Sequence, residues 1–278
     1  MVKKELIKKR FLTIDKNESV SKLIGDFIRT GQKTALVYDK KRYIGVSDKN
    51  LLLRTKLNPA QMKISKCIKK VPALTGKEDN AEVARLLFTA ETRLLPVIDK
   101  GKVVGVIRTI DLINELGKED LRKKISEVMT IQPIVIGEND RVGKAIEIMK
   151  EEKVSRIPIV DKKRELLGIT SFTDVLSQYL VRQQGKGETR GRGGLTRKGS
   201  STIRSYEAEK MDLHAYPIKN LTSNTIITAS PDDKVSKIID LMNKYNISSI
   251  VLVEGRSPVG IITARDLLKL FLKDQVTF

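Results

Sequence analysis

The sequence predicts an α+β protein built from four tandem copies of one β-α-β-β-α unit. Two observations predict it. The stretch VGIITARDLL at residues 259–268 has weaker echoes earlier in the chain, LLGITSFTDVL and VVGVIRTIDLI. Each of them also ends the same succession of a helical apolar pattern and two short apolar runs. Self-similarity of this kind is typical of repeated supersecondary units that bury their apolar faces against one another.

The leading glycine of the motif sets the register of the units. Gly45, Gly105, Gly168 and Gly260 are separated by 60, 63 and 92 residues. The last interval is about 30 residues too long, which predicts four repeats with one insertion between the third and the fourth.

Each unit is expected to open with a short strand and an amphipathic helix. The strand is expected at residues 134–136 in the third unit and 226–228 in the fourth. In the helices, apolar residues recur at helical spacing and predict one buried face. The core positions expected on these faces are Val20, Leu23, Ile24, Phe27, Val83, Ala84, Leu87, Val142, Ala145, Ile146, Met149, Val235, Ile238, Ile239 and Met242.

A hairpin and a second helix complete each unit. The runs ALVYDKKRYIGV, LLPVIDKGKVVGVI, RIPIVDKKRELLGIT and SIVLVEGRSPVGII each hold two β-rich segments around a polar turn. Such pairs are typical of antiparallel hairpins. The glycine-led motif therefore spans the end of a hairpin and the start of a helix.

Composition narrows the function classes. The net charge of +19 favours anionic partners, although a lysine-rich solvated surface would give the same total. Cys67 and His214 are the only residues of their types, which excludes an intramolecular disulfide and leaves little for zinc binding or Cys–His catalysis. No apolar run approaches the ~18 residues of a membrane span, and the basic start lacks a secretory signal, so we expect a cytoplasmic protein.

The β-α-β-β-α order and the ending G-h-h-[ST]-x-x-D, where h is apolar, resemble the CBS domain. This regulatory module occurs in tandem pairs called Bateman modules, and the resemblance covers nearly the whole chain apart from the insertion. It implies one pair over residues 1–120 and another over 121–278. The implied boundaries are 11–57 and 62–117 for the first two units, 122–182 for the third, 183–211 for the insertion and 216–274 for the fourth.

Thr263 and Asp266 have two interpretations. As a capping box, Thr263 accepts from a backbone N–H at the helix start and Asp266 reaches back. As a ligand site, the hydroxyl meets a phosphate at the positive helix end and the carboxylate accepts both hydroxyls of a ribose. The two roles are compatible, because a ligand can replace the cap partner.

The resemblance implies specific roles for a set of residues. In CBS proteins that bind adenosine nucleotides, the acid is the ribose ligand and the hydroxyl lies near the phosphates, which points to Asp266 with Thr263 and to Asp174 with Ser171. Phosphate cations stand just before the first hairpin strand, where this chain has Arg156 and, one position earlier, Arg93. The implied adenine cleft is formed by Ile134, Val154, Ser155, Ile227, Ile247 and Ser248.

Departures from the pattern weaken some of these sites. In the second unit Arg108 replaces the hydroxyl while Asp111 remains, so that site would bind ribose and meet phosphate with charge. The first unit reads as one residue short, with Asn50 where the acid belongs, and we expect that site to be empty. The fourth unit has Ser248 and Ser249 in place of arginine, so its phosphate cation must come from elsewhere, for example across the pair.

The insertion is basic and rich in glycine. Residues 182–204 hold seven basic residues, one acid and six glycines, and almost no large apolar side chain. Three readings stay open: a flexible linker, a basic lid that orders over bound phosphates, and an arm that binds RNA or DNA.

Together these features predict a non-enzymatic regulatory protein that senses adenosine nucleotides. The architecture resembles the gamma subunit of AMP-activated kinase, with two Bateman modules packed as a disc within one chain or across a homodimer. AMP, ADP or ATP is the expected ligand, and S-adenosylmethionine fits a phosphate-binding turn less well. Ligand occupancy would alter contacts with an unidentified partner protein. The competing hypothesis is a nucleic-acid-binding protein that uses the basic insertion, with the CBS units as scaffold.

Overall fold

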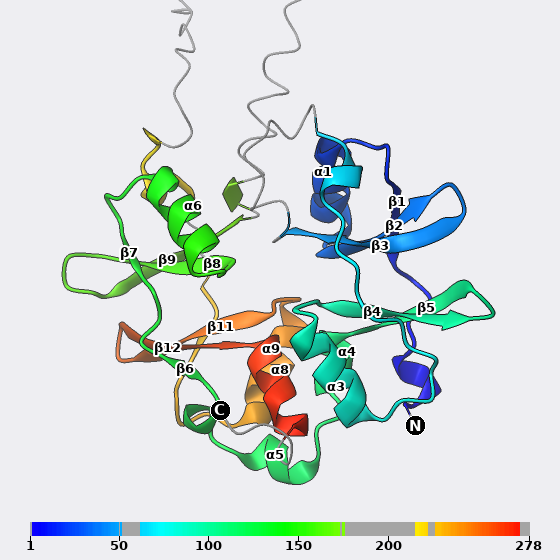
Figure 1. The fold of residues 1–278 in the computed structure, drawn as a ribbon. Helices are drawn as coiled ribbons and strands as arrows, with labels where there is room; N and C mark the ends of the chain where they lie inside the picture. The colour runs from blue at the N-terminus through cyan, green and yellow to red at the C-terminus, as the bar shows by residue number, and fades with distance from the viewer. Residues whose placement is uncertain are drawn as a thin grey trace, which may run out of the picture.

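The computed structural model describes residues 2–49, 51, 62–172, 174–175, 215–221 and 226–272. Within these ranges a helix followed by an antiparallel hairpin occurs four times, as the sequence predicts (Figure 1). The first unit contains β1 (Leu12–Asp15), α1 (Val20–Thr30), β2 (Thr34–Asp39) and β3 (Arg42–Asp48). The second contains α3 (Asn80–Thr89), β4 (Leu94–Asp99), β5 (Lys102–Arg108) and α4 (Thr109–Ile113).

The second half of the chain repeats the same order. The third unit contains β7 (Ile136–Gly137), α6 (Val142–Glu151), β8 (Arg156–Val160) and β9 (Leu166–Ser171). The fourth contains β10 (Thr228–Ala229), α8 (Val235–Lys244), β11 (Ser249–Glu254), β12 (Ser257–Thr263) and α9 (Ala264–Leu268). Short segments connect or flank the units: η1 (Lys4–Leu6), η2 (Ile64–Lys66), α5 (Lys118–Arg122), η3 (Ile125–Glu127), β6 (Thr130–Ile131), η5 (Ile218–Leu221) and η6 (Lys269–Phe271).

The opening strands are shorter and later than predicted. The strand expected at 134–136 is β7, which starts at Ile136 and pairs in parallel with β8. The one expected at 226–228 is β10, which starts at Thr228 and pairs in parallel with β11. Pro133 has no N–H to give to a ladder, and Ile134 beside it is 38% exposed. In the second unit the opening strand is reduced to a single parallel bridge, from Leu74 to Val97.

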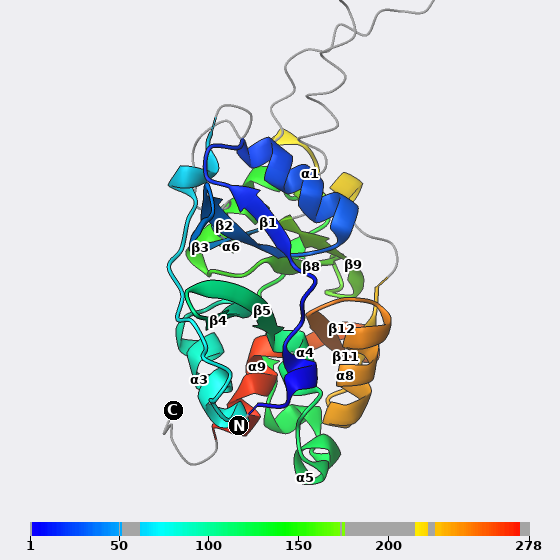
Figure 2. The same cartoon turned by 90° about the vertical axis from the view of Figure 1, so that its right-hand side faces the viewer.

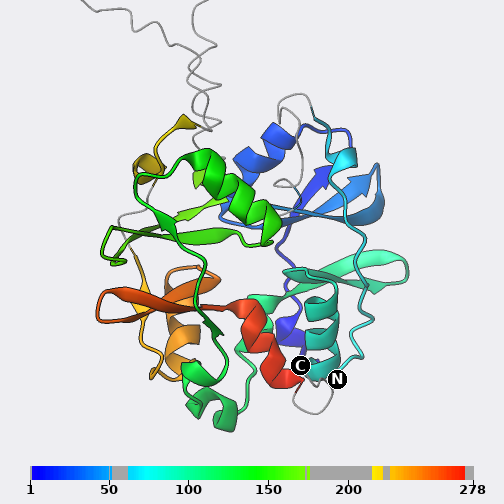
Figure 3. The ribbon, with the colours of Figure 1, turned by 60° about the vertical axis from the view of Figure 1, so that its left-hand side comes forward.

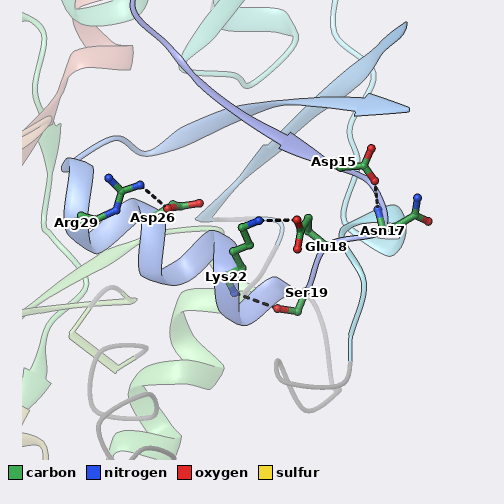
Figure 4. A network of polar contacts seen from close by, with 7 residues as sticks. All are labelled: Asp15, Asn17, Glu18, Ser19, Lys22, Asp26 and Arg29. Atoms are coloured by element: carbon green, nitrogen blue, oxygen red, sulfur yellow. Dashed lines mark hydrogen bonds and ion pairs between the residues drawn. The ribbon is translucent and has the colours of Figure 1, made fainter. Parts of the chain in front are cut away.

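Helix α1 shows how local sequence starts and ends an element. Ser19 Oγ accepts a hydrogen bond from Lys22 N at 3.2 Å and caps the first turn (Figure 4). Gly31 ends the helix with φ of 68°. Arg29 donates to Asp26 Oδ1 at 2.7 Å on the outer face. The local sequence therefore determines where the helix that carries this apolar face begins and ends.

The helices pack in two groups that join different halves of the chain. The predicted core residues of the first and third helices are buried in one cluster, and those of the second and fourth helices are buried in another. Accordingly, α1 and α6 lie on one face of the molecule, while α3, α8 and α9 lie on the opposite face (Figures 2 and 3). The hairpins lie between these layers and face each other. The two halves thus pack as a four-unit disc within one chain.

The leading glycine of the motif is required where another segment crosses the hairpin. A Cβ on Gly45 would lie 2.6 Å from Lys69 O, because the segment that leads into the second unit bridges to Val46 of the first. A Cβ on Gly260 would lie 2.9 Å from Met129 Sδ, because β6 adds to the fourth unit's sheet beside β12. The glycine therefore permits neighbouring units to interlock.

None of the helices in the described ranges is long and apolar enough to cross a membrane. The helix expected after each hairpin is present as α4 and α9 in the second and fourth units. In the first and third units only its first residues fall within the described ranges.

Candidate functional site

A cavity of about 480 Å³ lies at the centre, where the loops from helix to hairpin of all four units converge. These loops contribute residues 30–34, 91–94, 153–156 and 246–249 to its wall. The ends of β3, β5 and β12 add Asp48, Arg108 and Thr263, and the following turn adds Asp266. The equivalent loops of all four units therefore line one cavity.

The hairpin register identifies the equivalent position in each unit. The last residue of the second strand pairs with the first residue of the first strand, and these pairs are Asp48 with Thr34, Arg108 with Leu94, Ser171 with Arg156, and Thr263 with Ser249. The first unit is therefore not one residue short. The acid position, three residues after Asp48, falls on Leu51 and not on Asn50. Asn50 itself lies outside the described residues.

In the fourth unit the motif forms the capping box. Thr263 Oγ1 accepts from Asp266 N at 3.3 Å, and Asp266 Oδ2 accepts from Thr263 N at 2.9 Å and from Thr263 Oγ1 at 2.7 Å. Both residues also line the central cavity. The capping interpretation is confirmed, and the capped turn borders the cavity.

The third unit repeats this arrangement. Asp174 Oδ2 accepts from Ser171 N and from Ser171 Oγ, each at 2.7 Å. Ser171 and Asp174 are not among the described residues that line the cavity. Asp174 nevertheless opposes the lowering of the pKa values of Lys49 and Arg156, so it lies within electrostatic reach of these two cations.

In the second unit the acid is already paired. Arg108 donates from Nε to Asp111 Oδ2 at 2.6 Å and from a terminal nitrogen to Oδ1 at 2.7 Å, and this hydrogen bonding raises the pKa of Arg108. The Asp111 side chain is only 11% exposed. Arg108 faces its own acid, so both carboxylate oxygens that a ribose would need are occupied.

The cationic side chains before the hairpins reach into neighbouring units. Arg156 of the third unit donates to Ser249 Oγ at 2.7 Å and lies 3.5 Å from Ser248 Oγ in the fourth. The fourth unit, which has no arginine at this position, thus meets one from across the pair. Arg93 of the second unit approaches Ser155 Oγ of the third at 3.5 Å.

Lys33 of the first unit was missed by the sequence reasoning. Its Nζ donates to Asn246 O of the fourth unit at 3.2 Å. A signal was available, because Lys33 stands directly before the first hairpin strand, the position that Arg93 holds in its own unit. Lys49, directly after β3, has no counterpart in the other units and no comparable signal.

We call Lys33, Lys49, Arg93 and Arg156 the central cation cluster. Burial, and then repulsion from Arg156, Arg93 and Lys49, together lower the pKa of Lys33 to about 7. The pKa of Lys49 falls to about 8, first through burial and then through the two arginines. Mutual repulsion of this kind requires the four charges to lie close together.

The arginines of the central cation cluster are perturbed in the same direction. Burial and the neighbouring Arg93 lower the pKa of Arg156 to about 10. Burial also lowers the pKa of Arg93, which Asp48 partly opposes. The guanidinium groups remain charged at neutral pH, so the cavity holds a concentration of positive charge that an anion would relieve.

The predicted adenine cleft is assembled only in part. Val154, Ser155, Ile247 and Ser248 line the cavity. Ile134 and Ile227 are not among its described lining residues, because the opening strands begin one or two residues after them.

Other sequence predictions fall outside this site. The insertion at 182–204 and His214 lie outside the described residues, so the linker, lid and nucleic-acid readings stay predictions. Cys67 is buried. In the part of the chain that is described, no group of three or more His, Cys, Asp or Glu side chains is placed to hold a metal ion.

Comparison with protein families matches three of the four units. The model of the CBS domain matches residues 64–118, 125–180 and 218–273. The first unit is not matched, although its strands and helix follow the same order.

Curated relatives and solved structures extend over more of the chain. The uncharacterized protein MJ1404 of Methanocaldococcus jannaschii is 24% identical over 273 residues, which are 96% of this chain and 61% of that protein. An uncharacterized 33.4 kDa protein in the ribosomal RNA operon of Thermofilum pendens is 26% identical over 198 residues, 71% of this chain and 60% of its own length. The chain thus spans about three fifths of these relatives.

Solved structures match this chain nearly end to end. Protein MJ1225 of Methanocaldococcus jannaschii, proposed to be an archaeal homolog of g-AMPK, superposes with a TM-score of 0.76 at 18% identity, covering 96% of this chain and 98% of that one. At this identity the match establishes the fold alone.

Proposed function

The chain belongs to the CBS domain family, and from that premise we propose that it is a regulatory protein that binds an adenosine nucleotide in its central cavity. One observation carries the proposal. Lys33, Arg93 and Arg156, one cation from each of three units, line a single cavity whose wall also holds the capped acid Asp266. Lys49 and Asp174 lie within electrostatic reach of these cations. A ligand that combines hydroxyl groups with phosphate matches this combination.

Different residues would bind the ribose, the base and the phosphate of the nucleotide. Asp174 and Asp266 would accept the ribose hydroxyls, while Val154 and Ile247 would offer apolar contact to the base. Arg156 would hold the nearest phosphate with two parallel hydrogen bonds, a geometry that lysine cannot reproduce.

The charge of the cavity bears on ligand identity. AMP, ADP and ATP all bring phosphate to the central cation cluster. S-adenosylmethionine would bring a positively charged sulfonium to the same region, where repulsion opposes it. We therefore propose a nucleotide as the physiological ligand.

We propose no catalytic role. The protein would act as two Bateman modules, residues 1–120 and 121–278, whose mutual packing changes with ligand occupancy and alters contact with a partner protein. The crossing of Lys69 over Val46 and the pairing of β6 with β12 support this grouping, because each interlocks two units of the same module. A homodimer and an intracellular location remain part of the proposal.

The test is calorimetric titration of ATP into the double variant Asp174→Ala with Asp266→Ala. We expect binding to be abolished, or weakened at least 100-fold, because each lost carboxylate removes charge-assisted hydrogen bonds of about 1.5–3 kcal/mol. Asp111→Asn is the matched control: it changes the same repeat position, but Arg108 already occupies that acid. The control should bind ATP like the wild type.

Thermal unfolding of the double variant shows whether its fold is intact, since both substitutions also remove a helix cap. A folded double variant that binds ATP with unchanged affinity would contradict the proposal.

A further inference from the structure

The two halves of the chain differ in three respects, two of them at equivalent repeat positions, and all three favour the same division of roles. The first position is the acid. The second half presents Asp174 and Asp266, each bonded through Oδ2 to its own cap. The first half has Leu51 at one such position and Asp111, closed by Arg108, at the other. At this repeat position the first half therefore has no acid that is free of a bidentate arginine.

The second position lies two residues before the hairpin. The second half has the apolar residues Val154 and Ile247 there, and the first half has Gln32 and Thr92. Gln32 Oε1 accepts from Leu12 N at 2.9 Å, and Thr92 Oγ1 donates to Leu94 O at 3.0 Å. These polar groups hold their own loops together and offer no apolar surface to a base.

The third difference is the source of positive charge. Three members of the central cation cluster, Lys33, Lys49 and Arg93, belong to the first half. Lys33 and Arg93 extend into the loops of the second half that carry Ile247 and Val154, at Asn246 and Ser155. The remaining member, Arg156, is hydrogen-bonded to Ser249.

Two buried hydroxyl groups add to the first half's side of the cavity. Thr34 and Thr109 line the cavity and are 3% and 7% exposed. Neither Oγ1 has a hydrogen-bond partner in the described part of the chain. Unpaired buried donors are costly, and rotation toward a phosphate oxygen would satisfy them.

We propose that the halves divide one ligand between them: the second half holds the adenosine and the first phosphate, and the first half holds the outer phosphates, so the cavity selects nucleoside triphosphates over monophosphates. This inference rests on the proposed function and names its ligand class. AMP anchored by the second half reaches Arg156. The added phosphates of ATP extend to Lys33 and Arg93, where each adds negative charge to a cavity with excess positive charge, and Lys49 lies within electrostatic reach.

The test compares ATP and AMP affinities, measured by calorimetry without magnesium, in the wild type and in Lys33→Gln with Arg93→Gln. Removing two charge-assisted contacts should weaken ATP binding about 100-fold or more and change AMP binding less than about 3-fold. Lys144→Gln is the control for general charge, because Lys144 pairs with Asp140 at the surface. It should leave both affinities unchanged.

A second probe separates the two proposals. Inorganic tripolyphosphate should still bind to Asp174→Ala with Asp266→Ala, and should lose that binding when Lys33 and Arg93 are also changed to Gln. Equal wild-type affinities for ATP and AMP, or a parallel loss of both in the lysine–arginine variant, would overturn the division while nucleotide binding stands. Absence of wild-type binding to either nucleotide would overturn both proposals.

Discussion

The pKa of Lys33 depends on its surroundings, and phosphate bound beside it would change that pKa. Its pKa is about 7 in the folded protein against an ordinary 10.5, so between those pH values the unfolded chain binds more protons than the folded one. Folding stability contributed by this group therefore rises with pH across that window. Bound phosphate would reverse the shift by favouring the charged amine.

A pH dependence of ATP binding follows. We expect ATP affinity to fall as pH rises from about 7 to 9, because binding must then take up a proton at Lys33, whose pKa is about 7. Lys49, whose pKa of about 8 is lowered by the same arginines, should make the fall of ATP affinity with pH steeper. Calorimetry over this pH range checks it, and Lys33→Gln should show a shallower dependence. A flat wild-type profile would contradict the assignment.

At the scale of elements, the sequence allowed the fold to be predicted well wherever one pattern decided the outcome. Helical periodicity identified the buried faces, and polar turns identified the hairpins. Opening strands were misplaced because their limits depend on pairing with a distant strand, as for Ile136 with Ile159. The position of Leu51 could have been found in the sequence, because it lies six residues after Gly45, the spacing at which Asp111, Asp174 and Asp266 follow their glycines. The hairpin register agrees with that spacing.

The candidate site was predictable in part for the same reason. Asp266 and Asp174 carry a motif that local sequence displays. The pairing of Arg108 with Asp111 is an i,i+3 contact that local spacing could have indicated. The convergence of Lys33 with Arg93 depends on packing between units, which no local pattern contains.

The interlocking glycine gives a prediction about stability. Gly45→Ala should lower the free energy of unfolding by about 1–3 kcal/mol, because the new Cβ would lie 2.6 Å from Lys69 O and φ is +151°. Gly25→Ala is the control: a Cβ there meets nothing within 4 Å in α1, so it should raise stability by up to about 1 kcal/mol. Urea unfolding of both variants checks this. Equal stability of the two variants would contradict the crossing contact as the reason for the glycine.

At the scale of the molecule, the disc brings two dissimilar halves around one cavity. The helix layers tie the first unit to the third and the second to the fourth, so neither half is packed alone. A ligand held by both halves would stabilise their packing, and loss of that ligand would loosen it. The proposed regulatory output rests on this coupling.

The central claim, a nucleotide in the central cavity, is tested most directly by thermal unfolding of the wild-type chain with AMP, ADP, ATP and S-adenosylmethionine at equal concentrations. A ligand that binds only the folded state raises the melting temperature by mass action. We predict the largest rise with ATP, smaller rises with ADP and AMP, and none with S-adenosylmethionine. Unchanged melting temperatures with all three nucleotides, or a rise with S-adenosylmethionine alone, would contradict it.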